Sequence, residues 1–198
     1  EIIINQLKKA DITDIVISTG YLEEMIRIFF MDGLKFGVNI TYSKEEEPRG
    51  TAGPLNLVRD QLTDTFILMN GDVLSDINFH DFIAFHKKNG AEATIALCKR
   101  SVPIDFGVVE VDGSHIFSKW MEKPTLEYLV STGIYVLEPS TLESLPHSGF
   151  FNLPDFICKL HEEKHRVLGY FHNGYWLDIG RPEDYERACV DQEEKGAW

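Results

Sequence analysis

The sequence is poor in positive charge and in cysteine, and it lacks a long apolar run. Lys and Arg number 19 against 32 Asp and Glu, which gives a net charge of −13. Because so acidic a chain repels a nucleic-acid backbone, we expect no nucleic-acid partner. The apolar runs stay well below the roughly 18–20 residues that a membrane span needs, so we expect no membrane partner. The three widely spaced cysteines, Cys98, Cys158 and Cys189, form no CxxC motif, which predicts reduced thiols in a cytoplasmic protein.

The remaining composition is that of a globular protein. The 198 residues are 43% hydrophobic and 26% charged, enough for one domain with a sizeable core. Apolar patterning predicts strands at 14–19, 38–43, 65–69, 93–98, 106–111, 116–122, 133–137 and 166–171. It predicts helices at 1–10, 22–31, 55–61, 78–89, 152–163 and 182–194. This alternation predicts a three-layer, Rossmann-like α/β fold, with a mixed, mostly parallel sheet and helices on both faces.

The first candidate site is Asn70-Gly71-Asp72, which directly follows an apolar strand. In open α/β sheets, ligands bind beyond the carboxyl ends of the strands, so the Asp72 carboxylate would project into a crevice. Gly71 would allow close backbone approach. The alternative is a plain hairpin turn, since Asn-Gly is a strong hairpin signal.

The second candidate is Asp178, between Leu177 and Ile179 at the end of a predicted strand. Apolar neighbours predict that this carboxylate is partly shielded from water, which calls for a partner or a metal ion. The alternative is a turn or helix-capping Asp, since Pro182 suits the first turn of the next helix.

Two further segments are weaker candidates. Glu122-Lys123-Pro124 ends a strand, and Lys123 could meet a phosphate there or form a solvated pair with Glu122. The small-residue loop Gly50-Thr51-Ala52-Gly53-Pro54 could bring its amides close to a base or a sugar. It is no P-loop, because no Gly-Lys-Ser/Thr follows.

One metal motif is set aside. His161-Glu162-Glu163-Lys164-His165 matches H-E-x-x-H, the zinc pattern of metalloproteases. Both histidines lie off the apolar stripe of their helix, and His165 falls where the helix is predicted to end. We therefore interpret the motif as an ordinary polar helix end.

Several short motifs, in this order, resemble those of the sugar-phosphate nucleotidyltransferases, the nucleotide-sugar pyrophosphorylases. They are DIVISTGY (14–21), GTAG (50–53), NGD (70–72), FGVV (106–109), EKP (122–124), GIYV (133–136), and WLDIG (176–180) with PEDY (182–185). The GTAG variant looks more like the mannose-1-phosphate guanylyltransferase branch than the thymidylyl branch. The resemblance extends from residue 1 to about residue 188.

The resemblance implies a reaction and a role for each matching residue. A sugar 1-phosphate would attack the α-phosphorus of a nucleoside triphosphate, and pyrophosphate would leave. Asp72 and Asp178 would hold Mg²⁺, and Lys123 would hold the sugar phosphate. The remaining expected substrate contacts are Gly50, Thr51 and Ala52 at the base, Asn70 and Gly71 beside Asp72, and Gly107, Glu122 and Gly133 at the sugar.

The resemblance also implies a missing part. The family opens with a strand and a Gly-rich triphosphate loop that residues 1–198 do not supply, while residues 1–10 read as a helix without a cap. We therefore expect this segment to fold as one nucleotidyltransferase domain and to be poorly active by itself. The strand edge left open would invite association into a homo-oligomer.

Two alternatives stay open from the sequence. A non-catalytic sugar-nucleotide-binding regulatory domain would share the fold. A glycosyltransferase would share a nucleotide fold and an acidic metal site, but Asp72-Val73-Leu74 does not give the Asp-x-Asp motif that is common there. Neither the sugar nor the base is specified.

Overall fold

The computed structural model describes residues 1–20 and 23–195. Tyr21 of the DIVISTGY motif and Leu22 of the expected helix 22–31 lie outside the described residues. Within the described part, the three cysteines are unbridged: Cys98 is buried, and Cys158 and Cys189 are exposed. None of the helices described is both long and apolar enough to span a membrane.

The core of the fold is a four-stranded sheet in the order β3-β8-β5-β9. Its strands are β3 (Phe66–Met69), β8 (Thr125–Leu137), β5 (Ala93–Pro103) and β9 (Val167–Phe171). β5 and β9 are parallel, whereas β8 is antiparallel to both β3 and β5. The mixed sheet is confirmed, but its expected mostly parallel pairing needs correction. The reason is that the chain leaves the sheet along β5 and returns beside it along β8.

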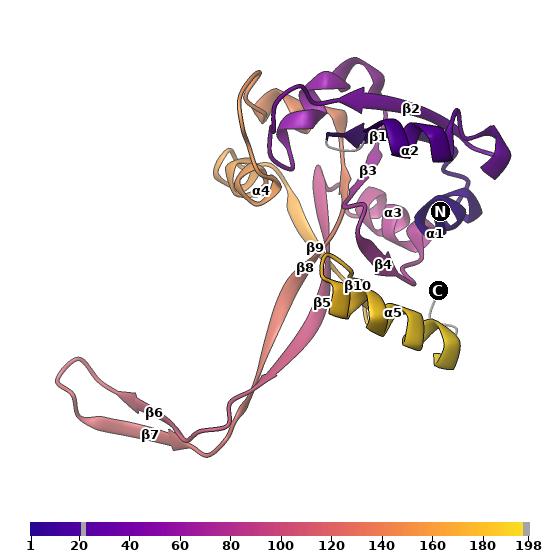
Figure 1. The fold of residues 1–198 in the computed structure, drawn as a ribbon. Coiled ribbons are helices and arrows are strands. Elements are labelled where there is room, and N and C mark those ends of the chain that lie inside the picture. The colour runs from indigo at the N-terminus through magenta and orange to yellow at the C-terminus, as the bar shows by residue number, and fades with distance from the viewer. Residues whose placement is uncertain (21–22, 196–198) are drawn as a thin grey trace.

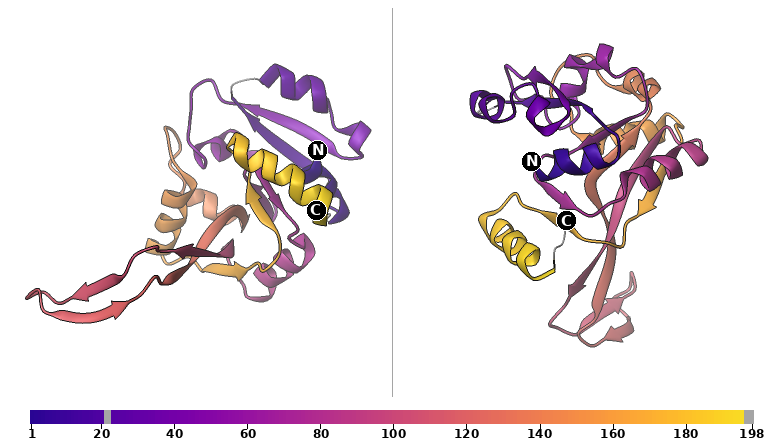
Figure 2. Two further views of the ribbon diagram at one scale, coloured as in Figure 1. Left: turned by 60° about the horizontal axis from the view of Figure 1, so that its bottom comes forward. Right: turned by 90° about the vertical axis from the view of Figure 1, so that its right-hand side faces the viewer.

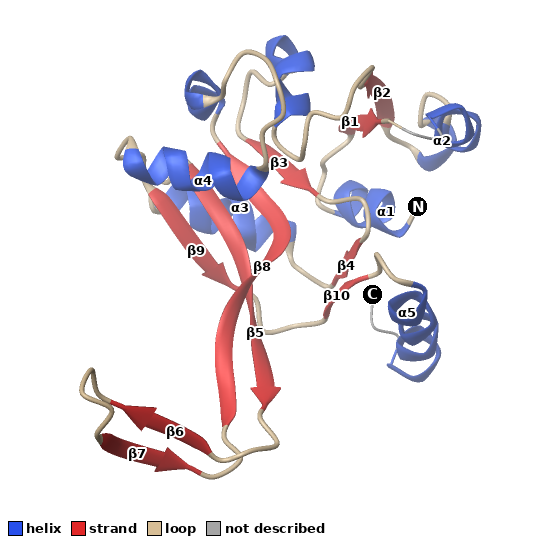
Figure 3. Cartoon of the chain, turned by 60° about the vertical axis from the view of Figure 1, so that its left-hand side comes forward, coloured by secondary structure: helices blue, strands red, loops and turns tan. Residues whose placement is uncertain are grey.

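Helices cover both faces of this sheet and give the expected three layers (Figure 3). Ile134 and Val136 of β8 pack with α1 (Ile2–Lys9) and α3 (Phe79–Lys88), around the fully buried Phe82. The intervening Tyr135 and Leu137 pack with α4 (Leu153–Glu162). Alternate side chains of a strand point to opposite faces, so one strand supplies both halves of the core.

A second unit lies at the start of the chain (Figure 1). β1 (Asp14–Thr19) pairs in parallel with β2 (Asn39–Lys44), and α2 (Glu23–Phe30) connects them. In the described part of the chain, β1 pairs only with β2 and β3 pairs only with β8. Whether their open edges support association of two copies stays a prediction, as does the single domain over residues 1–198.

The short connecting helices are 3-10 turns rather than α-helix. They are η1 (Leu34–Phe36), η2 (Gly53–Leu57), η3 (Arg59–Gln61) and η4 (Pro139–Ser144). The helix expected at 55–61 is therefore present as two 3-10 turns. A break at Val58 leaves two turns, each too short to develop the α-helical hydrogen-bond pattern.

Two three-residue strands, β4 (Val73–Ser75) and β10 (Trp176–Asp178), pair antiparallel beside the central sheet. Their inward residues Leu74 and Leu177 pack against Ala188 of α5 (Pro182–Lys195). Since β4 pairs with β10 and not with β3, the plain hairpin reading of Asn70-Gly71-Asp72 was wrong.

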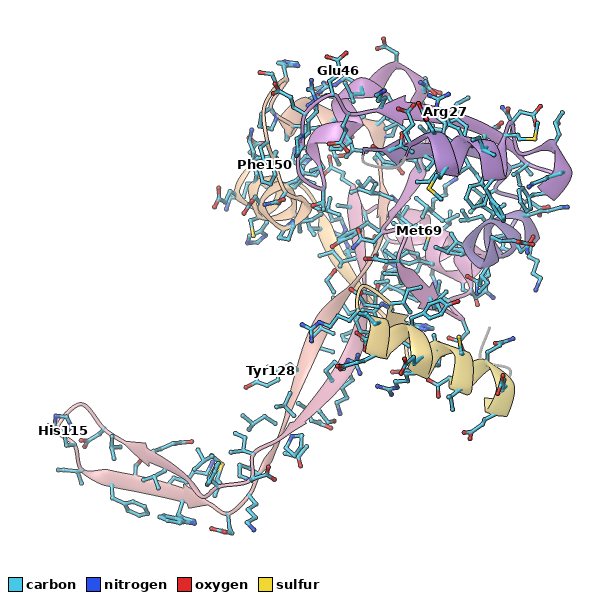
Figure 4. All side chains as sticks on the ribbon, viewed as in Figure 1. Arg27, Glu46, Met69, His115, Tyr128 and Phe150 are labelled. Carbon is cyan, nitrogen blue, oxygen red and sulfur yellow. The ribbon has the colours of Figure 1, made fainter. Side chains whose placement is uncertain are left out.

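β5 and β8 run well past the expected 93–98 and 133–137 and leave the body as a two-stranded ribbon (Figures 1 and 2). The ribbon ends in a hairpin of β6 (Val108–Val111) and β7 (Phe117–Met121). We call residues 99–129 the arm and the rest of the described chain the body. Figure 4 labels Tyr128 on the ribbon and His115 near the hairpin tip.

Candidate active site

The turn after β3 is fixed by contacts with β8. The amide of Asn70 donates to the carbonyl oxygen of Gly133 at 3.0 Å. Gly133 has a φ of +77°, and a Cβ there would lie 2.9 Å from Nδ2 of Asn70. A side chain at position 133 would therefore be strained and would displace Asn70. Two predicted site residues from distant parts of the sequence are thus in contact.

Asp72 and Asp178 are brought together by the pairing of β4 with β10. Asp178 lies opposite Val73, and the amide of Ile179 donates to the carbonyl oxygen of Asp72 at 2.8 Å. A Cβ placed on Gly180 would lie 3.0 Å from Oδ1 of Asp178 and 3.6 Å from Oδ2 of Asp72. Both carboxylate oxygens therefore border one small space, which Gly180 leaves open.

The expected shielding of Asp178 was wrong, because both carboxylates are exposed. Leu177 and Ile179 point away from Asp178 along the strand and pack toward α5. Oδ1 of Asp178 also accepts a hydrogen bond from the amide of Gly180 at 2.9 Å. Asp178 therefore does stabilise a turn, as the alternative interpretation proposed. Its Oδ2 atom and the carboxylate of Asp72 remain available to a ligand.

A cavity of about 530 Å³ opens beside these residues. Four predicted residues line it, namely Thr51, Asn70, Gly133 and Asp178. The residues that sequence reasoning did not select are Ser131, Thr132, Tyr135, Asn152, Leu153, Pro154, Asp155 and Trp176. Hydroxyl, amide and carboxylate groups beside two aromatic rings suit a ligand that combines hydroxyls with a ring.

The loop before η2 is bound to the start of α4. The amides of Ala52 and Gly53 donate to the carbonyl oxygen of Phe151 at 3.0 and 3.1 Å. A Cβ on Gly50, whose φ is +75°, would lie 2.6 Å from that same oxygen. The hydroxyl oxygen of Thr51 accepts from the amide of Leu153 at 2.8 Å and so caps α4. Ala52 is fully buried, so Thr51 is the residue of this loop that reaches the cavity.

Glu122, Lys123 and Gly107 are on the arm, and none of them lines the cavity. Nε1 of Trp120 donates to Oε2 of Glu122 at 3.0 Å, and Gly107 lies directly against Trp120. Lys123 has a φ of +43°, a left-handed backbone value that is strained for a residue other than glycine. The structure therefore separates two groups of predicted residues. Thr51, Asn70, Gly133 and Asp178 line the cavity, whereas Gly107, Glu122 and Lys123 lie on the arm.

Tyr175, which precedes β10, holds this strand to α5. Its hydroxyl donates to Oδ2 of Asp191 at 3.0 Å. Burial and the Asp191 carboxylate raise the pKa of Tyr175 to about 12. Tyr175 therefore remains a neutral donor at physiological pH and keeps Trp176 and Asp178 in place.

Two other constellations do not form reactive sites. Nε2 of His172 lies 3.3 Å from Oγ of Ser75 and 3.0 Å from Asp76. Because one ring nitrogen meets both groups, the imidazole cannot relay a proton between them as it does in a catalytic triad. His165 of the H-E-x-x-H motif lies beyond the end of α4, where Nδ1 bonds Glu92 at 2.8 Å.

Across residues 1–20 and 23–195, no three or more His, Cys, Asp or Glu side chains are grouped to hold a metal ion. Asp72 and Asp178 supply two carboxylates beside one space. Mg²⁺ commonly takes only one or two carboxylates and completes its shell with phosphate oxygens and water. The pair therefore fits a Mg²⁺ ion that arrives with a phosphorylated ligand.

Comparison with known proteins gives a consistent result. The chain is 35% identical over 192 residues to a mannose-1-phosphate guanyltransferase of Schizosaccharomyces pombe, and 36% identical over 190 residues to that of Yarrowia lipolytica. In both cases the match covers 92% of this chain and 52% of the relative. The chain thus spans about half the length of the curated relatives it matches.

Solved structures show the same fold. HddC from Yersinia pseudotuberculosis superimposes with a TM-score of 0.70 at 22% identity, over 94% of this chain and 82% of that one. A Bacillus anthracis protein provisionally assigned as a glucose-1-phosphate thymidylyltransferase gives 0.75 at 24% identity, over 96% and 80%. The nucleotidyl transferase family model matches residues 1–195. The chain therefore belongs to the nucleotidyl transferase family.

Proposed function

We propose that this protein transfers a nucleotidyl group from a nucleoside triphosphate to a sugar 1-phosphate, giving a nucleotide-diphospho-sugar and pyrophosphate. The observation that carries the proposal is the juxtaposition of Asp72 and Asp178 beside Gly180, at a cavity lined by hydroxyl, amide and aromatic groups. Family membership and the guanyltransferase relatives support it. GTP and mannose 1-phosphate are the first substrates to test.

Asp72 and Asp178 would hold Mg²⁺, which would neutralise charge on the reacting phosphates. The rest of the chain positions the two substrates. A phosphate oxygen of the sugar 1-phosphate attacks the α-phosphorus in line, so catalysis depends on alignment and charge neutralisation more than on proton transfer. Thr51, Asn70 and Gly133 would contact the bound substrates at the cavity wall.

The arm residues have a separate role in this proposal. Lys123 would bind the phosphate of the sugar substrate, and Glu122 would accept hydrogen bonds from sugar hydroxyls beside Gly107. These three residues lie outside the cavity lining, so they act only if bound substrate brings the arm and the cavity together. Gly50 and Gly71 would act through their backbones at the edges of the site. Ala52, which is buried with its amide bonded to Phe151, would hold the loop in position for them.

A second candidate is a non-catalytic domain that binds nucleotide sugars. The observation that favours it is that Glu122 and Lys123 are absent from the cavity lining. Release of pyrophosphate distinguishes the two candidates, because a binding domain would bind a nucleotide sugar without synthesising it and would release no pyrophosphate.

The test is an assay of pyrophosphate release by the full-length protein, with a panel of nucleoside triphosphates against a panel of hexose 1-phosphates and Mg²⁺. We expect one pair of substrates to support turnover. Asp72→Asn and Asp178→Asn should each lower turnover by a few orders of magnitude while the far-UV circular dichroism is unchanged. Asp64→Asn is the control, because Asp64 is an exposed carboxylate outside the cavity lining. Near-normal turnover in both site variants would overturn the metal assignment.

A further inference from the structure

The charge of the cavity is unfavourable for the ligands proposed above. Its lining includes the carboxylates of Asp155 and Asp178 and has no Lys or Arg. A phosphate group needs positive charge close by when it leaves water, and a single Mg²⁺ contacts only part of its oxygens. A cation at the rim of the cavity would supply the remainder.

Arg100 lies against Trp176, a residue of the cavity wall. Its guanidinium carbon lies 5.0 Å from the ring centroid of Trp176, a cation–π contact with a residue of the cavity wall. The ring is held in turn, because Nε1 of Trp176 donates to the carbonyl oxygen of Thr132 at 2.8 Å. Arg100 lies opposite Tyr128 at the body end of the arm, so its backbone is paired within the β5–β8 ladder two residues beyond the buried Cys98.

The same contact sets the distance of Arg100 from the carboxylate pair. Trp176 and Asp178 are two residues apart on β10, so both side chains project from the same face of the strand, and both line the cavity. Two residues of a strand span about 6.6 Å. A phosphate bound to a metal ion at Asp178 is therefore within the reach of a guanidinium stacked on Trp176.

In the described part of the chain, no acidic side chain forms an ion pair with Arg100. Its neighbour Lys99 is paired, with Nζ 2.6 Å from Oε2 of Glu127. Successive side chains of a strand point to opposite sides, so Lys99 faces away from Trp176. In a chain of net charge −13, an unpaired guanidinium beside an acidic cavity is available for an anionic ligand.

We propose that Arg100 binds the phosphate of a metal-bound substrate in this cavity, with its guanidinium held flat on Trp176 and its N–H groups directed to the phosphate oxygens. The inference rests on the proposed function and adds a binding residue to it. A guanidinium suits this task because its planar N–H groups can donate to two oxygens at once while its face stays on the ring. The phosphate belongs to the sugar 1-phosphate or to the nucleotide, and the experiment distinguishes them.

The experiment measures binding to the full-length protein by titration calorimetry. The two probes are mannose 1-phosphate and GTP, each with Mg²⁺, and the variants are Arg100→Gln, Arg100→Lys and the control Lys99→Gln. A hydrogen bond to a charged group is worth about 1.5–3 kcal/mol, which corresponds to a roughly 10–150-fold loss of affinity. We expect Arg100→Gln to cause such a loss for one probe and a much smaller loss for the other. The probe that loses affinity carries the phosphate that Arg100 contacts.

Arg100→Lys should recover only part of the affinity, because an ammonium group cannot donate two parallel hydrogen bonds from a stacked position. Lys99→Gln should leave both affinities within about twofold, since its charge is exposed and screened. Unchanged binding of both probes by Arg100→Gln would overturn the inference and leave the proposed function intact. An equal loss in Lys99→Gln would also overturn it, because the effect would then be one of overall charge. Failure of the unaltered protein to bind either probe would overturn the proposed function and this inference together.

Discussion

The paired strands β5 and β8 pass through two regions, the body and the arm, that surround them very differently. In the body, Ala93 of β5 and Ile134 of β8 are completely buried between two layers of helices. On the arm, the same two strands carry exposed side chains on both faces, and Trp120 at the end of the arm is 59% exposed. The backbone pairing of β5 with β8 extends from the body into the arm, with one register shift between Ile95 and Leu97, whereas the packing of their side chains ends where the arm begins.

This difference separates the two groups of predicted site residues. The cavity group is held by the core, by main-chain bonds such as Asn70 to Gly133, and by the pairing of β4 with β10. The arm group, with Glu122 and Lys123, depends on strand pairing and a few side-chain contacts. Regions with few buried apolar contacts open at lower free energy than the core. We therefore expect the cavity to be preformed and the arm to adjust when substrate binds.

The largest expected contrast is in stability. Phe156 of α4 is fully buried in the core, and Phe156→Ala should lower the free energy of unfolding by about 3–5 kcal/mol. Trp120→Ala on the arm removes a larger but mostly exposed ring and should cost less than about 1 kcal/mol. Urea unfolding followed by far-UV circular dichroism gives both values. Equal losses would mean that the arm shares the cooperative core of the body.

The second contrast concerns substrate binding. Lys123→Ala should raise the KM for the sugar 1-phosphate about 10–150-fold, because this is the loss of affinity that corresponds to one hydrogen bond to a charged group. It should change the KM for the nucleotide far less. Lys119→Ala is the matched control on the same hairpin, where Nζ of Lys119 lies 3.9 Å from Glu110. An equal rise for both substrates would assign Lys123 to the structure of the arm instead of to the sugar phosphate.

The carboxylate pair was predictable from the sequence, and much of its neighbourhood was not. Asp72 and Asp178 each follow or end an apolar segment, and the rule that ligands meet the carboxyl ends of strands selects both. The pairing of β4 with β10 left no periodic signal, because a three-residue strand is too short to show alternation. The structure of this pair therefore depends on contacts between residues about 100 positions apart.

Two other features depended on tertiary context. Residues 152–155 line the cavity because hydrogen bonds from the loop before η2 hold the start of α4 there. The sequence at the start of a helix does not indicate which other part of the chain that helix will face. The sequence patterning predicted separate short strands in place of the long strands β5 and β8 that form the arm. Its β-branched and aromatic residues read as half-buried strands, but no layer covers them, so the pattern of residues predicted pairing without predicting exposure.

A smaller contrast tests how the loop at the cavity is held. Thr51→Val keeps the shape of the side chain but removes the oxygen that accepts from the amide of Leu153. Losing a helix cap costs roughly 0.5–2 kcal/mol of stability. Thr125→Val, at an exposed position of the arm, is the control and should change stability by less than about 0.5 kcal/mol. If the two variants unfold at the same urea concentration, Thr51 does not cap α4 in solution.

The smallest expected effect is a pH dependence, and it again divides body from arm. In the body, the backbone amide of Arg166 and the side chain of His165 hydrogen-bond the carboxylate of Glu92 and hold its pKa below the usual value. A carboxyl group with a lower pKa in the folded state adds stability above its unfolded pKa, near 4.3, and loses it as pH falls through the folded value. The free energy of unfolding of the unaltered protein should therefore exceed that of the Glu92→Gln variant by a steady amount from about pH 7 to pH 5. The difference between the two proteins should shrink below about pH 4.

Because Glu92 is 36% exposed, solvent screens its interactions and the difference should stay below about 1 kcal/mol. Glu127→Gln on the arm is the matched control, since the pair of Glu127 with Lys99 is 53% and 59% exposed and has no backbone amide donor. Urea unfolding at a series of pH values from 3 to about 7 measures all three proteins. Parallel curves for the unaltered protein and Glu92→Gln over the whole range would show that the two bonds to Glu92 do not persist in solution. The body and the arm would then differ in packing alone and not in their polar contacts.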